Sequence, residues 1–172
     1  LEDLTQQLFL FDRFEAVVGT GAVPPYLGRW NSKWGAIEGL QAYFNKLTEE
    51  LVDPDELTRS ADTFLVSLAA AYRRYSGLLL ENNRLDFAHQ QKLAYDLLCD
   101  AEIAETITSN VKYVMVDEYQ DTNYIQEQLL LRLVGQRRNL CVVGDEDQSL
   151  YRFRGATVRN ILEFPARMPG TK

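Results

Sequence analysis

The sequence predicts an α/β fold whose second half holds parallel strands and whose first half is all helical. Two short apolar runs, at residues 112–116 and 140–143, have the nearly continuous pattern of strands that are covered on both faces. The stretch that joins them has the size of one strand, helix, strand unit, which is about 30 residues. Before residue 85, apolar residues recur at helical spacing and no run favours a strand. We therefore expect an all-helical region over residues 1–84 and an α/β region over residues 85–172.

The first half is expected to contain three main helices, each with one apolar stripe. Asp53 should cap a short helix that starts at Pro54, and Asn82 with Asn83 should end the third main helix. The stripes lie at positions 4, 8, 11 and 14 of a helix over residues 1–18, then at Trp34, Ile37, Leu40, Phe44, Leu47 and Leu51, and then at Phe64, Leu68, Tyr72, Tyr75 and Leu79.

The aromatic residues of this half are expected to pack in its core and not to bind a cofactor or DNA. A helical bundle buries rings that recur at helical spacing. His89 is the only histidine and has no cysteine beside it. We expect it on a helix surface or hydrogen-bonded in the core, not in a zinc site. The rings are Trp30, Trp34, Tyr43, Phe44, Tyr72 and Tyr75.

The second half begins with two helices, expected at residues 87–99 and 101–108, which lead into the first strand. Thr122 or Asn123 can cap the next helix, and Gly135 can end it. A crossover this short between two buried strands should be parallel and right-handed. The apolar face of this crossover helix is Ile125, Leu129, Leu130 and Leu133.

Composition narrows the class of protein. No apolar run reaches about 18 residues and no signal leader is present, so we expect a cytoplasmic protein without a membrane span. Cys99 and Cys141 are too few for a disulfide framework, and we expect two reduced core thiols. The net charge of −7 argues against nucleic-acid binding by bulk electrostatics. Any such contact should be a narrow track near the arginines at positions 137, 138, 152, 154 and 159.

Acidic residues follow both predicted strands. Asp117 and Glu118 come directly after the first strand, and Asp145 comes soon after the second. In open α/β sheets, ligands bind at the carboxyl ends of parallel strands. Hydrolysis of ATP needs a carboxylate for Mg²⁺, a group that orients or deprotonates water, and a polar group near the γ-phosphate. Asp117, Glu118 and Gln148 are of the right types for these three tasks.

Residues 111–164 resemble the motif II (Walker B) and motif III region of UvrD/Rep-type superfamily 1 DNA helicases. The resemblance rests on Asp-Glu-Tyr-Gln-Asp-Thr-Asn at 117–123 and on Val-Gly-Asp-Glu-Asp-Gln-Ser-Leu-Tyr-Arg-Phe-Arg-Gly-Ala at 143–156. Asn-Arg-Leu-Asp-Phe at 83–87 resembles the family's short Asp-Phe element, although Ala88 and His89 replace the acids that often follow. The resemblance implies a partial RecA-like (P-loop NTPase) lobe over residues 85–172. Residues 1–84 would then resemble the helical insertion, subdomain 1B.

The resemblance also implies roles for single residues. Asp117 would coordinate Mg²⁺, Glu118 would be the general base, and Gln148 would sense the γ-phosphate, so that all three contact ATP. Tyr151 and Phe153 would stack on the bases of single-stranded DNA, with Arg154 nearby; the family often has Trp at the position of Phe153. The implied partners are single-stranded DNA, junctions of single and double strands, and the remaining helicase domains.

Two elements of such a helicase are not found in this sequence. No Gly-x-x-x-x-Gly-Lys-Ser/Thr phosphate loop occurs, and no second RecA-like lobe follows. We therefore expect a fragment of an ATP-dependent 3′ to 5′ DNA helicase that is inactive by itself. Two other classes stay open. One is a stand-alone module that binds DNA or protein without ATPase activity, and the other is a metal-dependent nuclease using Asp117, Glu118, Asp121, Asp145 and Asp147.

Overall fold

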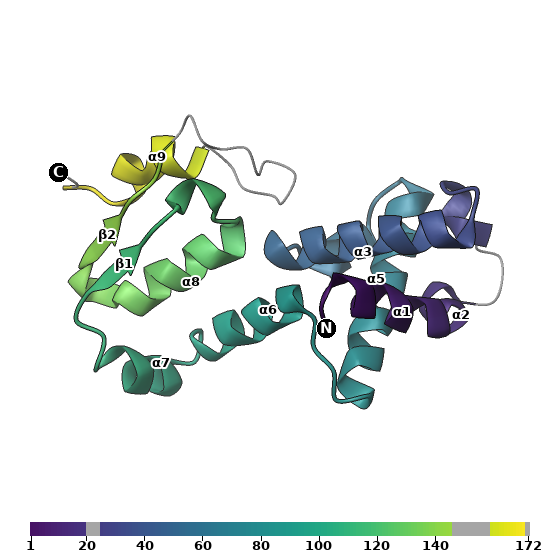
Figure 1. Ribbon diagram of the computed structural model, residues 1–172, viewed down its shortest axis with the longest axis horizontal. Coiled ribbons are helices and arrows are strands. Elements are labelled where there is room, and N and C mark those ends of the chain that lie inside the picture. The colour runs from purple at the N-terminus through teal and green to yellow at the C-terminus, as the bar shows by residue number, and fades with distance from the viewer. Residues whose placement is uncertain (20–24, 146–158, 171–172) are drawn as a thin grey trace. The chain divides into compact units, whose positions relative to one another are not determined.

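The computed structural model describes residues 1–19, 25–145 and 159–170, and it is mostly helical with a small two-stranded parallel sheet (Figure 1). The chain divides into two compact units, Leu1–Gln90 and Gln91–Lys172. We call them the helical unit and the α/β unit. No helix within the described ranges is both long enough and apolar enough to cross a membrane.

The helices of the helical unit begin at side-chain caps. Ser32 accepts a hydrogen bond from the Gly35 amide, and Asp53 and Asp62 cap the next two helices in the same way. Asn83, at φ 52°, follows the last helix in the left-handed region. The elements are α1 (Asp3–Asp12), α2 (Phe14–Val18), the short 3₁₀ helix η1 (Pro25–Gly28), α3 (Lys33–Glu49), α4 (Pro54–Leu57) and α5 (Thr63–Glu81).

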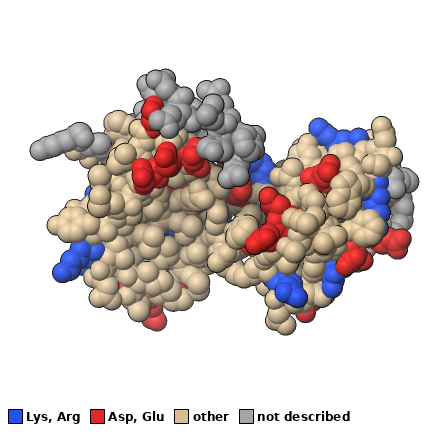
Figure 2. All heavy atoms as spheres, in the orientation of Figure 1, with Lys and Arg blue, Asp and Glu red and all other residues tan. Residues whose placement is uncertain are grey.

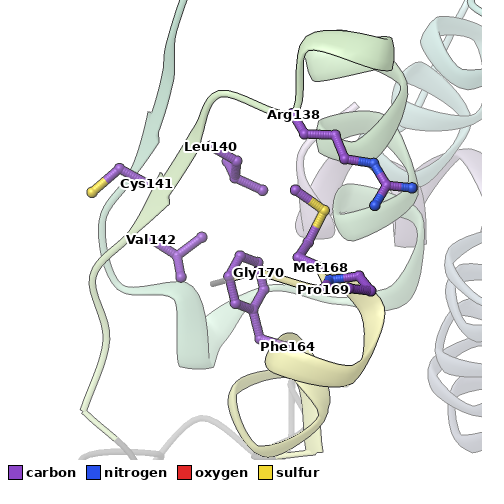
Figure 3. A pocket seen from close by; sticks show the side chains of 8 residues that line it. All are labelled: Arg138, Leu140, Cys141, Val142, Phe164, Met168, Pro169 and Gly170. Carbon is purple, nitrogen blue, oxygen red and sulfur yellow. The ribbon is translucent and has the colours of Figure 1, made fainter. Parts of the chain in front are cut away.

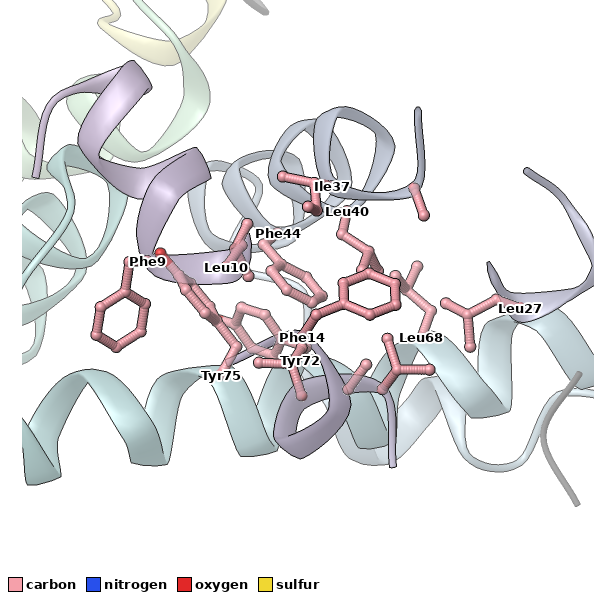
Figure 4. Packing of buried hydrophobic residues seen from close by; sticks show 14 of the residues in the cluster. Phe9, Leu10, Phe14, Leu27, Ile37, Leu40, Phe44, Leu68, Tyr72 and Tyr75 are labelled. Carbon is pink, nitrogen blue, oxygen red and sulfur yellow. The ribbon is translucent and has the colours of Figure 1, made fainter. Parts of the chain in front are cut away.

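The core of the helical unit lies between α1, α2, α3 and α5 (Figure 4). The rings of Phe44 and Tyr75 stack with their centroids 4.9 Å apart, and Tyr72 packs against Phe44. Trp30 and Tyr43 are partly buried against the same core. The prediction that the aromatic residues form the core is confirmed for these five and is wrong for Trp34, which is 42% exposed.

The expected apolar stripe of the first helix is confirmed at Phe14, which is buried, and wrong at positions 4, 8 and 11. Leu4 and Leu8 are 63% and 48% exposed, whereas Gln6, Phe9 and Leu10 are buried. Gln6 occupies a core position because its side chain finds partners there: its amide nitrogen donates to Asn45, Tyr75 and Asp86 at 2.9, 3.0 and 3.2 Å. A polar residue with such partners can be buried, and a stripe drawn through apolar residues alone misses it.

His89 belongs to a buried polar cluster, as expected for a hydrogen-bonded core histidine. Its Nδ1 lies 2.9 Å from Asp86 Oδ1, and its Nε2 lies 2.9 Å from Ser76 Oγ. Tyr75 donates its hydroxyl to Asp86 Oδ2 at 2.6 Å. Burial and the Asp86 carboxylate raise the pKa of Tyr75, so this hydroxyl stays a donor.

The α/β unit contains the predicted strand, helix, strand unit. β1 (Val114–Val116) pairs with β2 (Leu140–Val142) in parallel, and Met115 lies opposite Cys141. Asn123 and Gln126 form a capping box at the start of α8 (Tyr124–Val134), and Gly135 ends this helix at φ 49°. The remaining elements are α6 (Phe87–Leu97), which runs across the division between the units, α7 (Ala101–Thr108), η2 (Tyr119–Asp121), η3 (Gly135–Arg137) and α9 (Arg159–Arg167).

One face of the sheet is exposed in the described residues, which contradicts the expectation of strands covered on both faces. Tyr113 and Met115 are 77% and 79% exposed, and Val143 is also exposed. Figure 3 shows Leu140 and Val142 pointing toward α9 while Cys141 points to the opposite side. The predicted burial of Cys141 is therefore wrong, and Cys99 is exposed too. The reason is that α8 and α9 pack on the same face of the sheet, where they meet Val116, Leu140 and Val142.

Candidate active site

The carboxyl ends of β1 and β2 meet at one edge of the sheet. The amide of Val143 donates to the carbonyl of Val116 at 2.8 Å, and the amide of Tyr119 donates to the carbonyl of Val143 at 2.9 Å. These bonds continue the parallel pairing past the strands. Asp117 and Glu118 are exposed at this edge, and so is Asp145. Figure 2 shows acidic side chains gathered on the α/β unit where β1 leads into α8.

Glu118 has an unusual backbone conformation. Its φ of 52° and ψ of 42° lie in the left-handed region, which costs a non-glycine residue about 1–3 kcal/mol. The carboxylate of Asp117 stabilises this conformation because its Oδ1 accepts the Glu118 amide at 2.9 Å. Strained conformations of this kind persist only where the surroundings fix them, and they cluster at functional sites.

Tyr119 is the anchor that fixes the residues after Glu118. Its ring is fully buried and meets Phe164 of α9 edge to face, with the centroids 5.4 Å apart. Its hydroxyl donates to Glu127 Oε1 of α8 at 2.7 Å, and Arg167 of α9 pairs with the other oxygen of Glu127. Burial and the Glu127 carboxylate raise the pKa of Tyr119, which keeps the hydroxyl protonated. The turn that carries Glu118 is thereby tied to both helices.

Gln120 joins the ends of the two strands. Its side chain is 1% exposed. The side-chain amide donates to Glu118 Oε2, and the side-chain oxygen accepts the backbone amide of Asp145 at 3.1 Å. No role was predicted for Gln120. The available signal was a polar side chain two residues after Glu118, at a position that the fold buries.

The carboxylates at this edge fit a magnesium ion that accompanies a nucleotide. Mg²⁺ prefers oxygen ligands and is commonly held by one or two protein carboxylates, while waters and phosphates complete its shell. Asp117 is of this type and is exposed. Across residues 1–19, 25–145 and 159–170, no three His, Cys, Asp or Glu side chains form a group that could hold a metal ion.

Several predicted site residues lie outside the described residues. They are Asp147, Gln148, Tyr151, Phe153 and Arg154, together with Arg152 of the expected basic track. Another member of that track, Arg137, donates to the carbonyls of Ser109 and Val111 at 3.4 and 3.0 Å. Its side chain joins the end of α7 to the start of the sheet.

A pocket of about 360 Å³ lies between β2 and α9 (Figure 3). Leu140, Val142, Phe164 and Met168 give it apolar walls, and Arg138 lies at its edge. Glu118, the predicted catalytic residue that the structure describes, does not line it. The candidate active site is therefore the exposed edge at Asp117 and Glu118, and the pocket is a separate feature.

The chain is similar to proteins of known family. A family model described as UvrD/REP helicase N-terminal domain matches residues 4–169. ATP-dependent DNA helicase UvrD1 of Mycobacterium tuberculosis is 39% identical over 140 residues, which cover 74% of this chain and 18% of that protein. ATP-dependent DNA helicase PcrA of Bacillus subtilis is 39% identical over 122 residues, or 70% of this chain and 16% of that protein.

A third relative, a probable DNA helicase II homolog of Mycoplasma capricolum, is 42% identical over 118 residues, which cover 67% of this chain and 16% of that protein. The chain thus spans less than a fifth of the length of these relatives. The family match extends over nearly the whole chain and includes both acidic motifs. The chain belongs to the UvrD/REP helicase N-terminal domain family.

Proposed function

We propose that this chain is part of an ATP-dependent DNA helicase and that the edge at Asp117 and Glu118 is its site of ATP hydrolysis. The observation that carries the proposal is the placement of two exposed carboxylates directly after a strand, at the carboxyl edge of a parallel sheet. The relatives named as ATP-dependent DNA helicases support the same activity. Residues 85–172 would form part of a RecA-like lobe, and residues 1–84 the helical insertion.

Each residue of the site would have one task. Asp117 would hold Mg²⁺, which supplies positive charge to the phosphates when it is bound. Glu118 would take a proton from the water that attacks the γ-phosphorus, so that ATP and water become ADP and phosphate. Gln148 would sense the γ-phosphate. Asp117→Ala is then expected to weaken binding of Mg·ATP.

The aromatic pair Tyr151 and Phe153 would stack on the bases of single-stranded DNA, with Arg154 beside them. Stacking on rings holds single strands with little preference for sequence, and each ring contributes about 1–3 kcal/mol. The direction of movement would be the family's usual 3′ to 5′, and the substrates would include junctions of single and double strands.

This chain by itself should bind Mg·ATP weakly and should not hydrolyse it, because its sequence contains no phosphate loop. Calorimetry with Mg·ATP and steady-state assays with single-stranded DNA test this on the 172-residue chain and on the full-length protein. We expect hydrolysis that depends on DNA in the full-length protein alone. Turnover by the isolated chain would contradict the proposal, and metal-dependent nicking of DNA would favour the nuclease alternative.

The DNA contact is tested in the full-length protein with Tyr151→Ala and Phe153→Ala. Each change should weaken binding of single-stranded DNA by about 1–3 kcal/mol with little sequence preference. Melting temperatures of the same variants separate this from a packing role, since loss of a core ring would destabilise the fold. A stable double variant that binds DNA at full strength would remove both rings from the DNA path and favour a module without this function.

A further inference from the structure

We propose that Gln120 is a positioning residue that holds the carboxylate of Glu118 and ties its orientation to the end of β2. The inference rests on the proposed function, because it assumes that Glu118 is the general base. It adds a residue to the catalytic arrangement and a physical link between the ends of the two strands.

The position of Gln120 is fixed on both sides along the chain. Tyr119 before it is buried and hydrogen-bonded to α8. After it, Thr122 donates its hydroxyl to the carbonyl of Tyr119 at 2.7 Å, and Asn123 caps α8. With a side chain that is 1% exposed, Gln120 is enclosed and has little freedom to turn away.

The orientation of the Gln120 amide follows from its two partners. The backbone amide of Asp145 can only donate, so the side-chain oxygen of Gln120 must face it, 3.1 Å away. The side-chain NH₂ group then faces Glu118, whose ionised carboxylate accepts but does not donate. Exchange of the oxygen and nitrogen would break both contacts, so the network permits only this arrangement.

The hydrogen bond from Gln120 restricts the orientation of the Glu118 carboxylate, the proposed general base. Glu118 is exposed, and an exposed glutamate side chain has many accessible rotamers. A hydrogen bond to an ionised carboxylate is among the stronger ones and narrows this set. Because Gln120 donates to Oε2, the carboxylate presents Oε1 as the oxygen that can receive a proton from water. A general base must lie within about 2.6–3.2 Å of the proton's oxygen to work well.

The second contact extends the effect to the other strand. Asp145 follows β2, and its backbone amide is held by the same side chain that holds Glu118. A shift of the end of β2 relative to β1 would therefore pull on the Gln120 amide and reorient Glu118. Through Gln120, the geometry at one strand end sets the alignment of the base at the other.

The test uses the full-length protein with single-stranded DNA and measures kcat and KM for ATP hydrolysis. Gln120→Met keeps the volume and removes both hydrogen bonds. Gln120→Glu keeps an oxygen that can accept from the Asp145 amide but replaces the NH₂ donor to Glu118 with a second oxygen. This variant provides the test if Gln120→Met does not fold. We expect each variant to lower kcat about 10- to 100-fold with KM for ATP nearly unchanged, because misalignment of a catalytic group costs factors of this size.

The matched control is Gln126→Met. Gln126 accepts the Asn123 amide in the capping box of α8, so the change removes a structural hydrogen bond in the same unit without touching Glu118. We expect it to lower the melting temperature and to leave kcat within about twofold of the unmodified protein. An equal loss of kcat in the control at a matched loss of stability would overturn the positioning role.

A double-mutant cycle decides whether Gln120 acts through Glu118. In a Glu118→Gln background, Gln120→Met should have almost no further effect on kcat, because the base is already gone. Full additivity, or an unchanged kcat in both Gln120 variants, would overturn the inference. If Glu118→Gln alone leaves turnover at its full rate, Glu118 is not the general base and the proposed function is contradicted. This result is distinct from a failure of the Gln120 inference alone.

Discussion

Asp86 is a buried carboxylate of the helical unit with a full set of donors. It accepts hydrogen bonds from Tyr75 at 2.6 Å, from the His89 amide at 2.7 Å and from Gln6 at 3.2 Å. Burial by itself raises the pKa of Asp86, but the hydrogen bonds and charge of His89 outweigh it and hold this pKa below the ordinary value of 3.8. The structure thereby favours the ionised form.

The pH dependence follows from the sign of this shift. A carboxyl with a folded-state pKa below its unfolded value contributes its full stability above the unfolded pKa and loses it as the pH falls through the folded one. We expect the helical unit to lose this contribution below about pH 4. Asp86→Asn should flatten that part of the acid unfolding curve. It should also lower the free energy of unfolding at neutral pH by about 1–3 kcal/mol. Far-ultraviolet circular dichroism during acid titration measures both.

The control for this prediction is Asp12→Asn, an exposed carboxylate of the same unit. It should leave the acid unfolding curve unchanged within about 0.5 kcal/mol. The same acid transition in Asp86→Asn and in the unmodified chain would show that Asp86 does not contribute as described.

The positions of single residues were predictable from the sequence where they depend on strand ends. Asp117 and Glu118 lie after β1 because an apolar run followed by acids defines where a strand stops. Their chemical roles stay predictions. The bridge through Gln120 was not predictable, because it requires the backbone of Asp145, 25 residues further along the chain. The burial of Cys141 was wrongly predicted, since an apolar run does not show which faces of a strand are covered.

Among the elements, one glycine of α3 and the glycine of α5 lie in contrasting surroundings. A Cβ at Gly39 of α3 would overlap the indole ring of Trp30, which packs against Tyr43 and Phe64. A Cβ at Gly77 of α5 would meet no atom within 4 Å. Substitution to alanine therefore tests mainly packing at Gly39 and mainly helix propensity at Gly77.

Alanine at these two positions should have opposite effects. We expect Gly39→Ala to lower the free energy of unfolding by about 1–3 kcal/mol, because the Trp30 ring must move. We expect Gly77→Ala to raise it by about 0.5–1 kcal/mol through helix propensity and reduced freedom of the unfolded chain. Urea unfolding of both variants measures this, and a stabilising Gly39→Ala would show that Trp30 does not pack there.

The elements were the most predictable level of this structure. α8 begins after Asn123, one of the two caps that the sequence predicted for it. Ser32 and Asp62 cap α3 and α5 in the same local way, although neither cap was predicted. The phase of α1 was wrong because Gln6 is buried through partners on α3 and α5. Contacts between elements that are distant in the sequence decide which face of such a helix is buried, and the local spacing of apolar residues carries no information on those contacts.

At the scale of the whole chain, one apolar face of the sheet in the α/β unit is exposed to solvent. Met115 and Val143 are 79% and 57% exposed on it. Contiguous exposed apolar surface promotes association. We expect Met115→Thr with Val143→Thr to reduce self-association and dye binding of the isolated chain, and to change its free energy of unfolding by less than about 0.5 kcal/mol.

Val116→Thr is the matched control on the opposite face. Val116 packs against the buried cluster of Tyr119, Phe164 and Met168. Placing a hydroxyl there should cost about 1–3 kcal/mol without reducing association. Sedimentation velocity measures association and urea unfolding measures stability, and together they distinguish the two faces. Unchanged association of the Met115→Thr, Val143→Thr variant would show that the exposed face does not drive self-association.

We propose that Glu118, at the carboxyl edge of the sheet, activates the water that hydrolyses ATP. The most direct measurement is the rate of ATP hydrolysis by the full-length protein carrying Glu118→Gln, saturated with single-stranded DNA, together with its affinity for Mg·ATP. We predict a rate lower by roughly 10²- to 10⁴-fold with the affinity largely intact, because only proton transfer and the alignment of water are lost. Hydrolysis at the unmodified rate would contradict the account.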